Sequence, residues 1–329
     1  MSDRSIIFLH IPKTAGTSLQ KAIELFYERD EYFCIYDDEE RPGMAAFQKL
    51  TDAKKRDVKI FMGHFYFGLH ENIPQPCTYF TILRNPIDRV ISLHGHIKSL
   101  PCTSSDQKFK NKWEAARKMS LEEFVASDIL PIMHNQQVIL LSNLVSKKGE
   151  ATAESLEKAK SNLKEHFSVI GLTERLDETV ILLKRVLGMR MRFIISQNIA
   201  KEKRSIRELP EKTINLIKEK NKLDIALYDF VTELFNKQME KCGRHLDESV
   251  QAIKTANAYI SKLLNEVEAA QLTKQQQLAC QLAEQELKHT EERDYIIREV
   301  TEQFKASWSW KTTAPLRWAY EKIKMAHKA

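Results

Sequence analysis

The sequence predicts an α/β fold, in which a parallel sheet is flanked by helices and followed by a C-terminal helical coiled-coil arm. As far as Gly243, short apolar runs of strand length alternate with longer amphipathic segments, which is typical of a parallel sheet covered on both faces. After Gly243 the chain has no glycine and a single proline, Pro315. We therefore divide the chain into an α/β domain at 1–243, a coiled-coil arm at 244–305 and a basic aromatic tail at 306–329.

The overall composition narrows the class of protein. The formal net charge of +6 is modest for 329 residues and gives no indication of a nucleic-acid partner. The five cysteines are scattered and lack a CxxC pair, which argues against a disulfide scaffold or a zinc site and fits a reducing cytosol. Because the first strand directly follows Arg4 and no apolar run approaches the roughly 18 residues that span a bilayer, we expect a cytoplasmic protein without signal peptide or membrane anchor.

The opening stretch, Ser5–Leu19, predicts an anion site. Ile6–Leu9 is expected to be a buried strand and Thr17–Glu28 a helix, so the turn between them directs backbone N–H groups and the helix dipole to one point. The turn is P-loop-like but is not a Walker loop, because Lys13 precedes its only glycine. The alternative is a strand–helix turn whose polar side chains only cap the helix. The candidate anion-binding residues are Pro12, Lys13, Thr14, Ala15, Gly16, Thr17 and Ser18.

The remaining elements continue the alternation. Further strands are expected at Lys59–Met62, Thr78–Leu83, Ser168–Gly171 and Arg192–Ile195, and helices at Asp88–Ser99, Leu121–Ser127, His134–Leu144, Ala151–His166, Asp177–Leu187 and Pro210–Lys241. We expect Asp30–Lys55 to be a loop with one short helix, and Pro101–Lys118 to be a mobile hydrophilic insertion. Ligands of parallel sheets bind at the carboxyl ends of the strands, where His10, His64 and Arg84 all lie.

A second anion site is expected where the strand at Thr78–Leu83 passes into the next helix. Arg84 can bind a phosphate through two parallel hydrogen bonds, and Ser92 is close enough in the following helix to add a hydroxyl. The alternative is an arginine at the sheet edge beside a surface serine.

Both sites resemble motifs of one family. The string IPKTAGTS at Ile11–Ser18 closely resembles the 5′-phosphosulfate loop of sulfotransferases, which transfer sulfuryl groups from 3′-phosphoadenosine 5′-phosphosulfate (PAPS). RNPIDRVIS at Arg84–Ser92 resembles the family's R-[DN]-P-x-x-R-x-x-S motif, which implies that Arg84 and Ser92 bind the 3′-phosphate. The likeness extends over about residues 5–240, and is closest to the heparan sulfate 2-O-sulfotransferase-like branch with its bacterial relatives.

The resemblance also implies catalytic roles. Lys13 would hold the bridging oxygen and offset charge on departing 3′,5′-ADP, and His64 matches the proposed general base of the glycan 2-O-sulfotransferases. Met62 stands where the fullest family pattern has a second histidine. Lys203 is expected in a basic loop over the 3′-phosphate, and Arg89 is expected to be structural. No metal is expected, because sulfuryl transfer needs none.

We therefore expect a PAPS-dependent carbohydrate O-sulfotransferase that acts on a hydroxyl of a glycan or glycolipid precursor. Two alternatives stay open. A nucleotide-dependent kinase would need acidic ligands for Mg²⁺, and no well-placed acidic pair accompanies the loop. A non-catalytic nucleotide-binding scaffold would act through the coiled-coil arm. The sequence does not identify the acceptor sugar, although the segments around Arg41 and Pro101–Lys118 are expected to shape its site.

Some residues near these motifs have two interpretations. His10 is expected to pack beneath the turn rather than to act in the chemistry. His94 and His96 diverge on a helix, so we do not expect them to bind a metal together. The aromatic run Phe65–Phe67 fits stacking on a sugar or adenine as well as packing in the core.

The C-terminal segments predict contacts with other molecules. Apolar residues of the arm recur at heptad spacing from Leu246 through Val250 and Ile253, with Asn257 at a core position, which predicts a homo-oligomeric coiled coil. The alternative is an arm folded back along the α/β domain. The tail mixes tryptophans with basic residues, so we expect it to contact a membrane surface or an assembly partner.

Overall fold

The computed structural model describes residues 4–36, 43–102, 104, 106–130, 133–191, 194, 209–242 and 246–268. The chain divides into two compact units, Met1–Asn257 and Ala258–Ala329, and the first contains the whole sheet. Several predictions fall outside the described residues: Lys203 and its basic loop, Arg41, most of the strand expected at Arg192–Ile195, and the aromatic tail. Among the described residues, no helix combines the length and apolar character needed to cross a bilayer.

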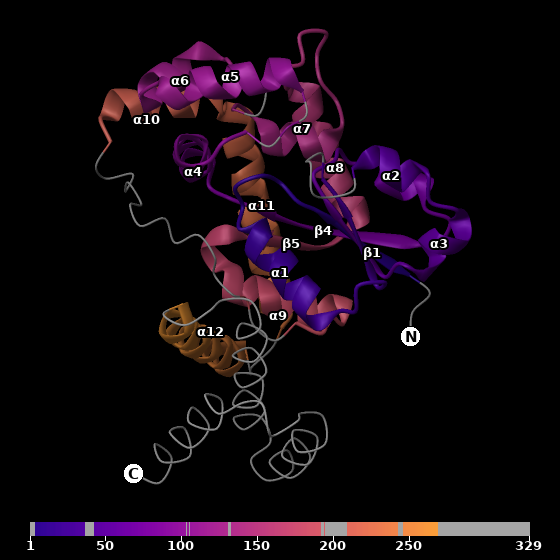
Figure 1. The fold of residues 1–329 in the computed structure, drawn as a ribbon. Helices are drawn as coiled ribbons and strands as arrows, with labels where there is room; N and C mark the ends of the chain where they lie inside the picture. Colours follow the sequence, from indigo (N-terminus) through magenta and orange to yellow (C-terminus); the bar gives the residue numbers. More distant parts are fainter. Residues whose placement is uncertain are drawn as a thin grey trace, which may run out of the picture. The chain divides into compact units, whose positions relative to one another are not determined.

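The sheet is parallel throughout the described chain and confirms the predicted α/β architecture (Figure 1). Its order is β2-β3-β1-β4-β5, and the strands are β1 (Ser5–Leu9), β2 (Tyr32–Ile35), β3 (Ile60–Gly63), β4 (Cys77–Leu83) and β5 (Phe167–Leu172). Four of these strands lie where the sequence predicts them. β2 corrects the prediction of a loop over Asp30–Lys55: it is the edge strand of the sheet, and pairing with β3 stabilises it.

The helices follow the predicted order with three corrections, the first being two short helices, Met44–Gln48 and Asp52–Asp57, where one was expected. They are α1 (Gly16–Phe26), α2 (Met44–Gln48), α3 (Asp52–Asp57), α4 (Pro86–Ser99), α5 (Gln107–Lys118), α6 (Leu121–Ser127), α7 (Gln136–Ser142), α8 (Ala153–His166), α9 (Leu176–Leu187), α10 (Glu211–Lys220), α11 (Lys222–Glu240) and α12 (Leu246–Glu268), with 3₁₀ turns η1 (Leu69–Asn72) and η2 (Thr173–Arg175). The expected mobile insertion contains α5, because the Asp106 carboxylate caps its N-terminus and Trp113 is buried. The long helix expected over Pro210–Lys241 breaks at Asn221. The buried side chain of Asn221 accepts the N–H of Asn135 and donates to the carbonyl oxygen of Ile217.

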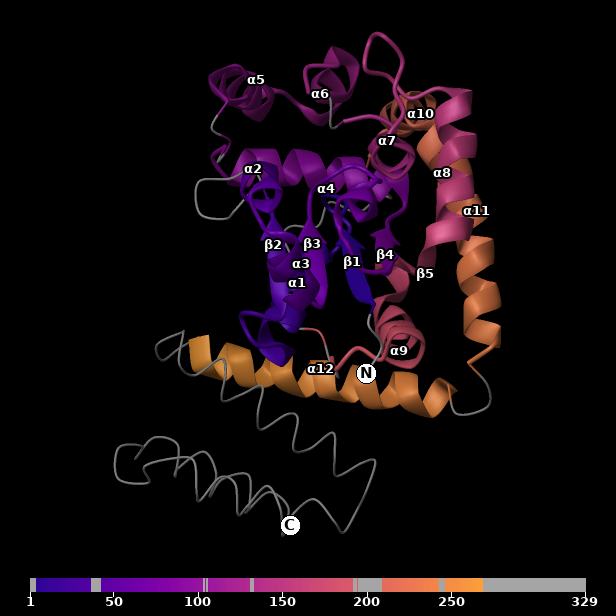
Figure 2. The same cartoon turned by 90° about the vertical axis from the view of Figure 1, so that its right-hand side faces the viewer.

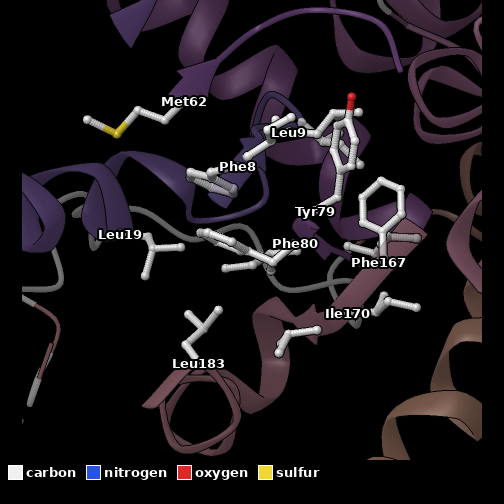
Figure 3. Close-up of a cluster of buried hydrophobic side chains, with 14 of the residues drawn as sticks. Phe8, Leu9, Leu19, Met62, Tyr79, Phe80, Phe167, Ile170 and Leu183 are labelled. Carbon is white, nitrogen blue, oxygen red and sulfur yellow. The ribbon is translucent and has the colours of Figure 1, made fainter. Parts of the chain in front are cut away.

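The main core fills both faces of the sheet (Figure 3). Phe8 and Phe80 stack with ring centroids 4.5 Å apart, and Leu19 of α1 and Leu183 of α9 lie on their side of the sheet. Tyr79 points to the opposite face, because successive strand residues alternate. A second core joins α4, α5, α6 and α10. In Figure 2, α4 lies across the end of the sheet at which the strands finish.

The first part of α12 packs on the α/β domain. Ile253 is buried in the main core. The side-chain amide of Asn257 donates to Asp177 Oδ1 at 2.6 Å and accepts the N–H of Ile194 at 3.0 Å. The polar residue expected inside a coiled coil therefore contacts the chain's own domain, as in the alternative of a folded-back arm. Oligomerisation through the rest of the arm stays a prediction.

We predict that Phe80→Ala lowers the free energy of unfolding by about 3–5 kcal/mol, since it opens a cavity between the stacked rings and α9. Val186→Ala, at a half-exposed site of α9, should change it by less than about 0.5 kcal/mol. Urea unfolding followed by circular dichroism measures both values. Equal effects of the two substitutions would contradict this packing.

Candidate active site

The turn between β1 and α1 has the backbone of an anion-binding loop. Lys13 and Ala15 both adopt positive φ, 72° and 65°, which non-glycine residues rarely do. Such strain concentrates at functional sites, where the surrounding structure enforces it. The buried hydroxyl of Thr14 donates to the carbonyl oxygen of Ile11 at 2.8 Å and fixes the turn. The N-cap residue of α1, Ala15, makes no side-chain cap bond, and the positive end of the helix dipole lies at the loop.

His10 forms the floor under this loop. Its ring is almost fully buried, stacks on Phe8, and bonds through Nδ1 to the Tyr36 hydroxyl at 2.9 Å. Gly16 lies so close to the ring that a Cβ there would stand 2.0 Å from it. Glycine is therefore required at position 16 for the loop to sit on His10, and the packing role expected of His10 agrees with these contacts.

The second predicted anion site lies directly beside the first. The guanidinium of Arg84 donates from Nη1 to the backbone oxygen of Lys13 at 3.1 Å. The sequence predicts both groups at the carboxyl ends of strands, and in the structure the Arg84 side chain contacts the loop itself. Burial and the positive charge of Arg84 lower the pKa of Lys13 to about 8.

Arg89 and Ser92, the other two residues of the motif at Arg84–Ser92, differ in their burial. Arg89 is fully buried and donates to Gln136 Oε1 and to the carbonyl oxygen of Met133, as expected of a structural residue. Ser92 lies on α4, half-buried. After Arg84, the N–H of Asn85 donates to Glu174 Oε1 at 2.9 Å. The strand–helix junction is thereby tied to the exit of β5.

His64 follows the end of β3 and is exposed to solvent. Its Nδ1 lies 2.7 Å from the backbone oxygen of His10. Because a carbonyl oxygen only accepts, Nδ1 carries the proton, and the basic lone pair belongs to Nε2. The His64 ring also packs against the Tyr36 ring, edge to face, with centroids 4.8 Å apart. The imidazole is thus oriented by the residue from which the anion-binding loop departs.

The three aromatic residues after His64 differ in their exposure to solvent. Phe65 and Phe67 belong to the core, whereas Tyr66 is 54% exposed. Only Tyr66 of this run therefore presents its ring to a ligand.

His96 lies near enough to Lys13 to feel its charge, which the sequence does not indicate. The sequence predicts that His94 and His96 diverge, and they do: His94 Nε2 lies 3.0 Å from the Met119 carbonyl oxygen, while His96 packs edge to face on Trp113. Burial and the nearby charge of Lys13 lower the pKa of His96 to about 4. Its position one helical turn after Ser92 is the signal that could have found it. Within the described residues, no group of three acidic, histidine or cysteine side chains could hold a metal.

The structure therefore brings the loop Pro12–Ser18, Arg84 and His64 together at the carboxyl edge of the sheet. Ser92 lies on the helix that begins beside Arg84, and Lys203 lies outside the described residues. A cationic, P-loop-like edge with an oriented imidazole is an arrangement typical of proteins that bind an anionic donor and transfer a group from it.

Comparison with known proteins specifies that class. The family model described as galactose-3-O-sulfotransferase matches residues 2–288, so the chain belongs to this family of PAPS-dependent carbohydrate sulfotransferases and is a sulfotransferase. The 2-O-like branch predicted from the sequence stays a prediction.

The relatives of the chain that we compare are named as sulfotransferases of heparan sulfate. Human (Homo sapiens) heparan-sulfate 6-O-sulfotransferase 1 is 26% identical over 286 residues, covering 72% of this chain and 67% of the relative. Heparan-sulfate 6-O-sulfotransferase 2 of Gallus gallus is 26% identical over 330 residues, covering 78% and 75%. A crystal structure of mouse sulfotransferase SULT7A1 complexed with PAP matches with a TM-score of 0.32 and 14% identity, over 67% of this chain and 66% of that one. This structural likeness is too weak to add to the assignment.

We predict opposite effects for the same substitution at two glycines. Gly16→Ala should lower the free energy of unfolding by about 1–3 kcal/mol, since the added methyl overlaps a buried ring that packing and a hydrogen bond hold in place. Gly95→Ala, in α4 with open space around it, should raise it by about 0.5–1 kcal/mol. Urea denaturation compares the two, and a Gly16→Ala protein as stable as wild type would contradict the described contact.

Proposed function

We propose that this protein transfers the sulfuryl group of PAPS to a hydroxyl of a carbohydrate, with His64 as general base. The observation that carries the proposal is that His10 connects the candidate base to the anion-binding loop. The His10 carbonyl orients the His64 imidazole, and the anion-binding loop Pro12–Ser18 starts two residues later. Base and donor loop are therefore adjacent, as a direct transfer between two bound molecules requires.

The donor has a negative charge at both ends, and the edge of the sheet offers a cationic group for each. The loop with Lys13 and the N-terminus of α1 suits the 5′-phosphosulfate. Arg84 suits the 3′-phosphate, with Ser92 adding a hydroxyl. Arg84 uses one N–H on the loop, and a guanidinium has five such donors, so the contact leaves capacity for a phosphate.

In the proposed transfer, the acceptor hydroxyl forms a bond to sulfur on the side opposite the bridging oxygen. The bond between sulfur and that oxygen breaks, and Lys13 offsets the charge that develops on departing 3′,5′-ADP. The proton of the acceptor hydroxyl passes to Nε2 of His64, the atom that carries the lone pair.

The acceptor is a carbohydrate by family membership, and we place it beside His64 and Tyr66. An exposed tyrosine two residues from the base can stack on a sugar face. The 3-hydroxyl of galactose and a 6-hydroxyl of heparan sulfate are the first candidates, since the matched family and relatives carry these names. A cytoplasmic location and a precursor acceptor stay predictions.

We predict that His64→Ala lowers kcat by about 10²–10⁴-fold while leaving the Kd for 3′,5′-ADP within twofold of wild type. Lys13→Ala should lower kcat/KM for PAPS by about 10²–10³-fold, because both binding and leaving-group stabilisation suffer. Product formation is read by mass spectrometry with PAPS and either oligosaccharides ending in galactose or heparan-type oligosaccharides. A His64→Ala protein with full turnover would remove His64 from the mechanism.

The lowered pKa of Lys13 predicts a pH dependence. The free enzyme carries the ammonium charge below about pH 8 and loses it as the pH rises through this value, so kcat/KM for PAPS should fall on the alkaline side. Lys13→Arg keeps its charge throughout this range and should lack this decline, whatever its absolute rate. Persistence of the same alkaline decline in Lys13→Arg would assign it to a different group.

A further inference from the structure

Arg84 is held by an unusual backbone contact. β4 pairs with β5 up to Leu83 and Leu172, so the N–H and carbonyl of Arg84 lie just past the last residue pair of this ladder. The side chain of Gln137 binds both groups: the Arg84 N–H donates to Gln137 Oε1 at 3.0 Å, and Gln137 Nε2 donates to the Arg84 oxygen at 3.0 Å. One side-chain amide thus acts in place of a neighbouring strand.

Gln137 is itself rigidly placed. It is fully buried in the first turn of α7, and its N–H donates to the buried carboxylate of Asp224 in α11, as does the N–H of Val138. In return, the Asn135 side chain accepts the N–H groups of Leu223 and Asp224 at the start of α11. Two helices therefore cap each other, and the pair fixes the amide that holds Arg84.

The neighbouring glutamine does a different task. Gln136 Oε1 accepts a hydrogen bond from the buried guanidinium of Arg89 at 3.0 Å. Arg89 lies in α4, and its guanidinium is fully buried beside the Asp224 carboxylate. Consecutive glutamines therefore hold the two arginines of one motif, and only Gln137 holds the one that reaches Lys13.

We propose that Gln137 is a positioning residue for donor binding: it fixes the Arg84 backbone so that the guanidinium faces the loop at Lys13. The inference rests on the proposed function, because the donor is PAPS. An apolar residue would fill the same space but would leave the N–H and carbonyl of Arg84 without this partner. The Arg84 backbone would then no longer be fixed, and neither would the position of its guanidinium.

The test compares Gln137→Met with Gln136→Met, which have the same length and the same loss of an amide. Both are expected to lower the melting temperature. Only Gln137→Met should raise the calorimetric Kd for 3′,5′-ADP and the KM for PAPS, by about tenfold. In an Arg84→Ala background, Gln137→Met should have no further effect on either value. If Gln137→Met does not fold, Gln137→Asn, which is too short to reach both groups, replaces it.

Each outcome separates the explanations. Equal weakening by the two glutamine variants, or full weakening by Gln137→Met on top of Arg84→Ala, would reduce Gln137 to general packing and overturn the proposal. Unchanged affinity in a folded Gln137→Met or Gln137→Asn protein would overturn it as well. A wild-type protein that does not bind 3′,5′-ADP would instead refute the proposed function, and the positioning role with it.

Discussion

The hydrogen bond between the Arg84 guanidinium and the Lys13 carbonyl joins two segments that are 71 positions apart in the chain. It is possible only because β1 and β4 are parallel neighbours, so that both strands finish at the same edge. The bond brings two cations near each other, which burial makes unfavourable: it contributes to the lowered pKa of Lys13. An anion bound between them would relieve that repulsion, so the free site favours a negatively charged ligand.

Support for this arrangement comes from uncharged groups. Backbone carbonyl oxygens accept hydrogen bonds from the His64 imidazole and the Arg84 guanidinium. The buried ring of His10 packs under Gly16, and the buried side-chain amide of Gln137 binds the Arg84 backbone. Neutral partners fix the geometry without cancelling the positive charge. Glu174 accepts the N–H of Asn85 and the hydroxyl of Tyr228. The charges of Asp88 and Glu174 partly offset the lowering of the Arg84 pKa by burial.

The parts of this site that local sequence patterns encode could be predicted from the sequence. Strand, turn and helix signals located the loop around Lys13, and a strand end followed by Pro86 located Arg84. Contacts that depend on tertiary packing could not be predicted in this way. The nearness of His96 to Lys13 arises from the path of α4, and the break at Asn221 from a side chain that bonds to a residue 86 positions away. β2 was missed because a short edge strand owes its existence to its neighbour.

A crystal structure with 3′,5′-ADP tests the central claim most directly, since that molecule keeps both phosphates of the donor. We predict the 5′-phosphate on the backbone N–H groups of the loop at Lys13, and the 3′-phosphate on Arg84. The reversed orientation, or a nucleotide bound away from this edge of the sheet, would contradict the joint role of the two loops.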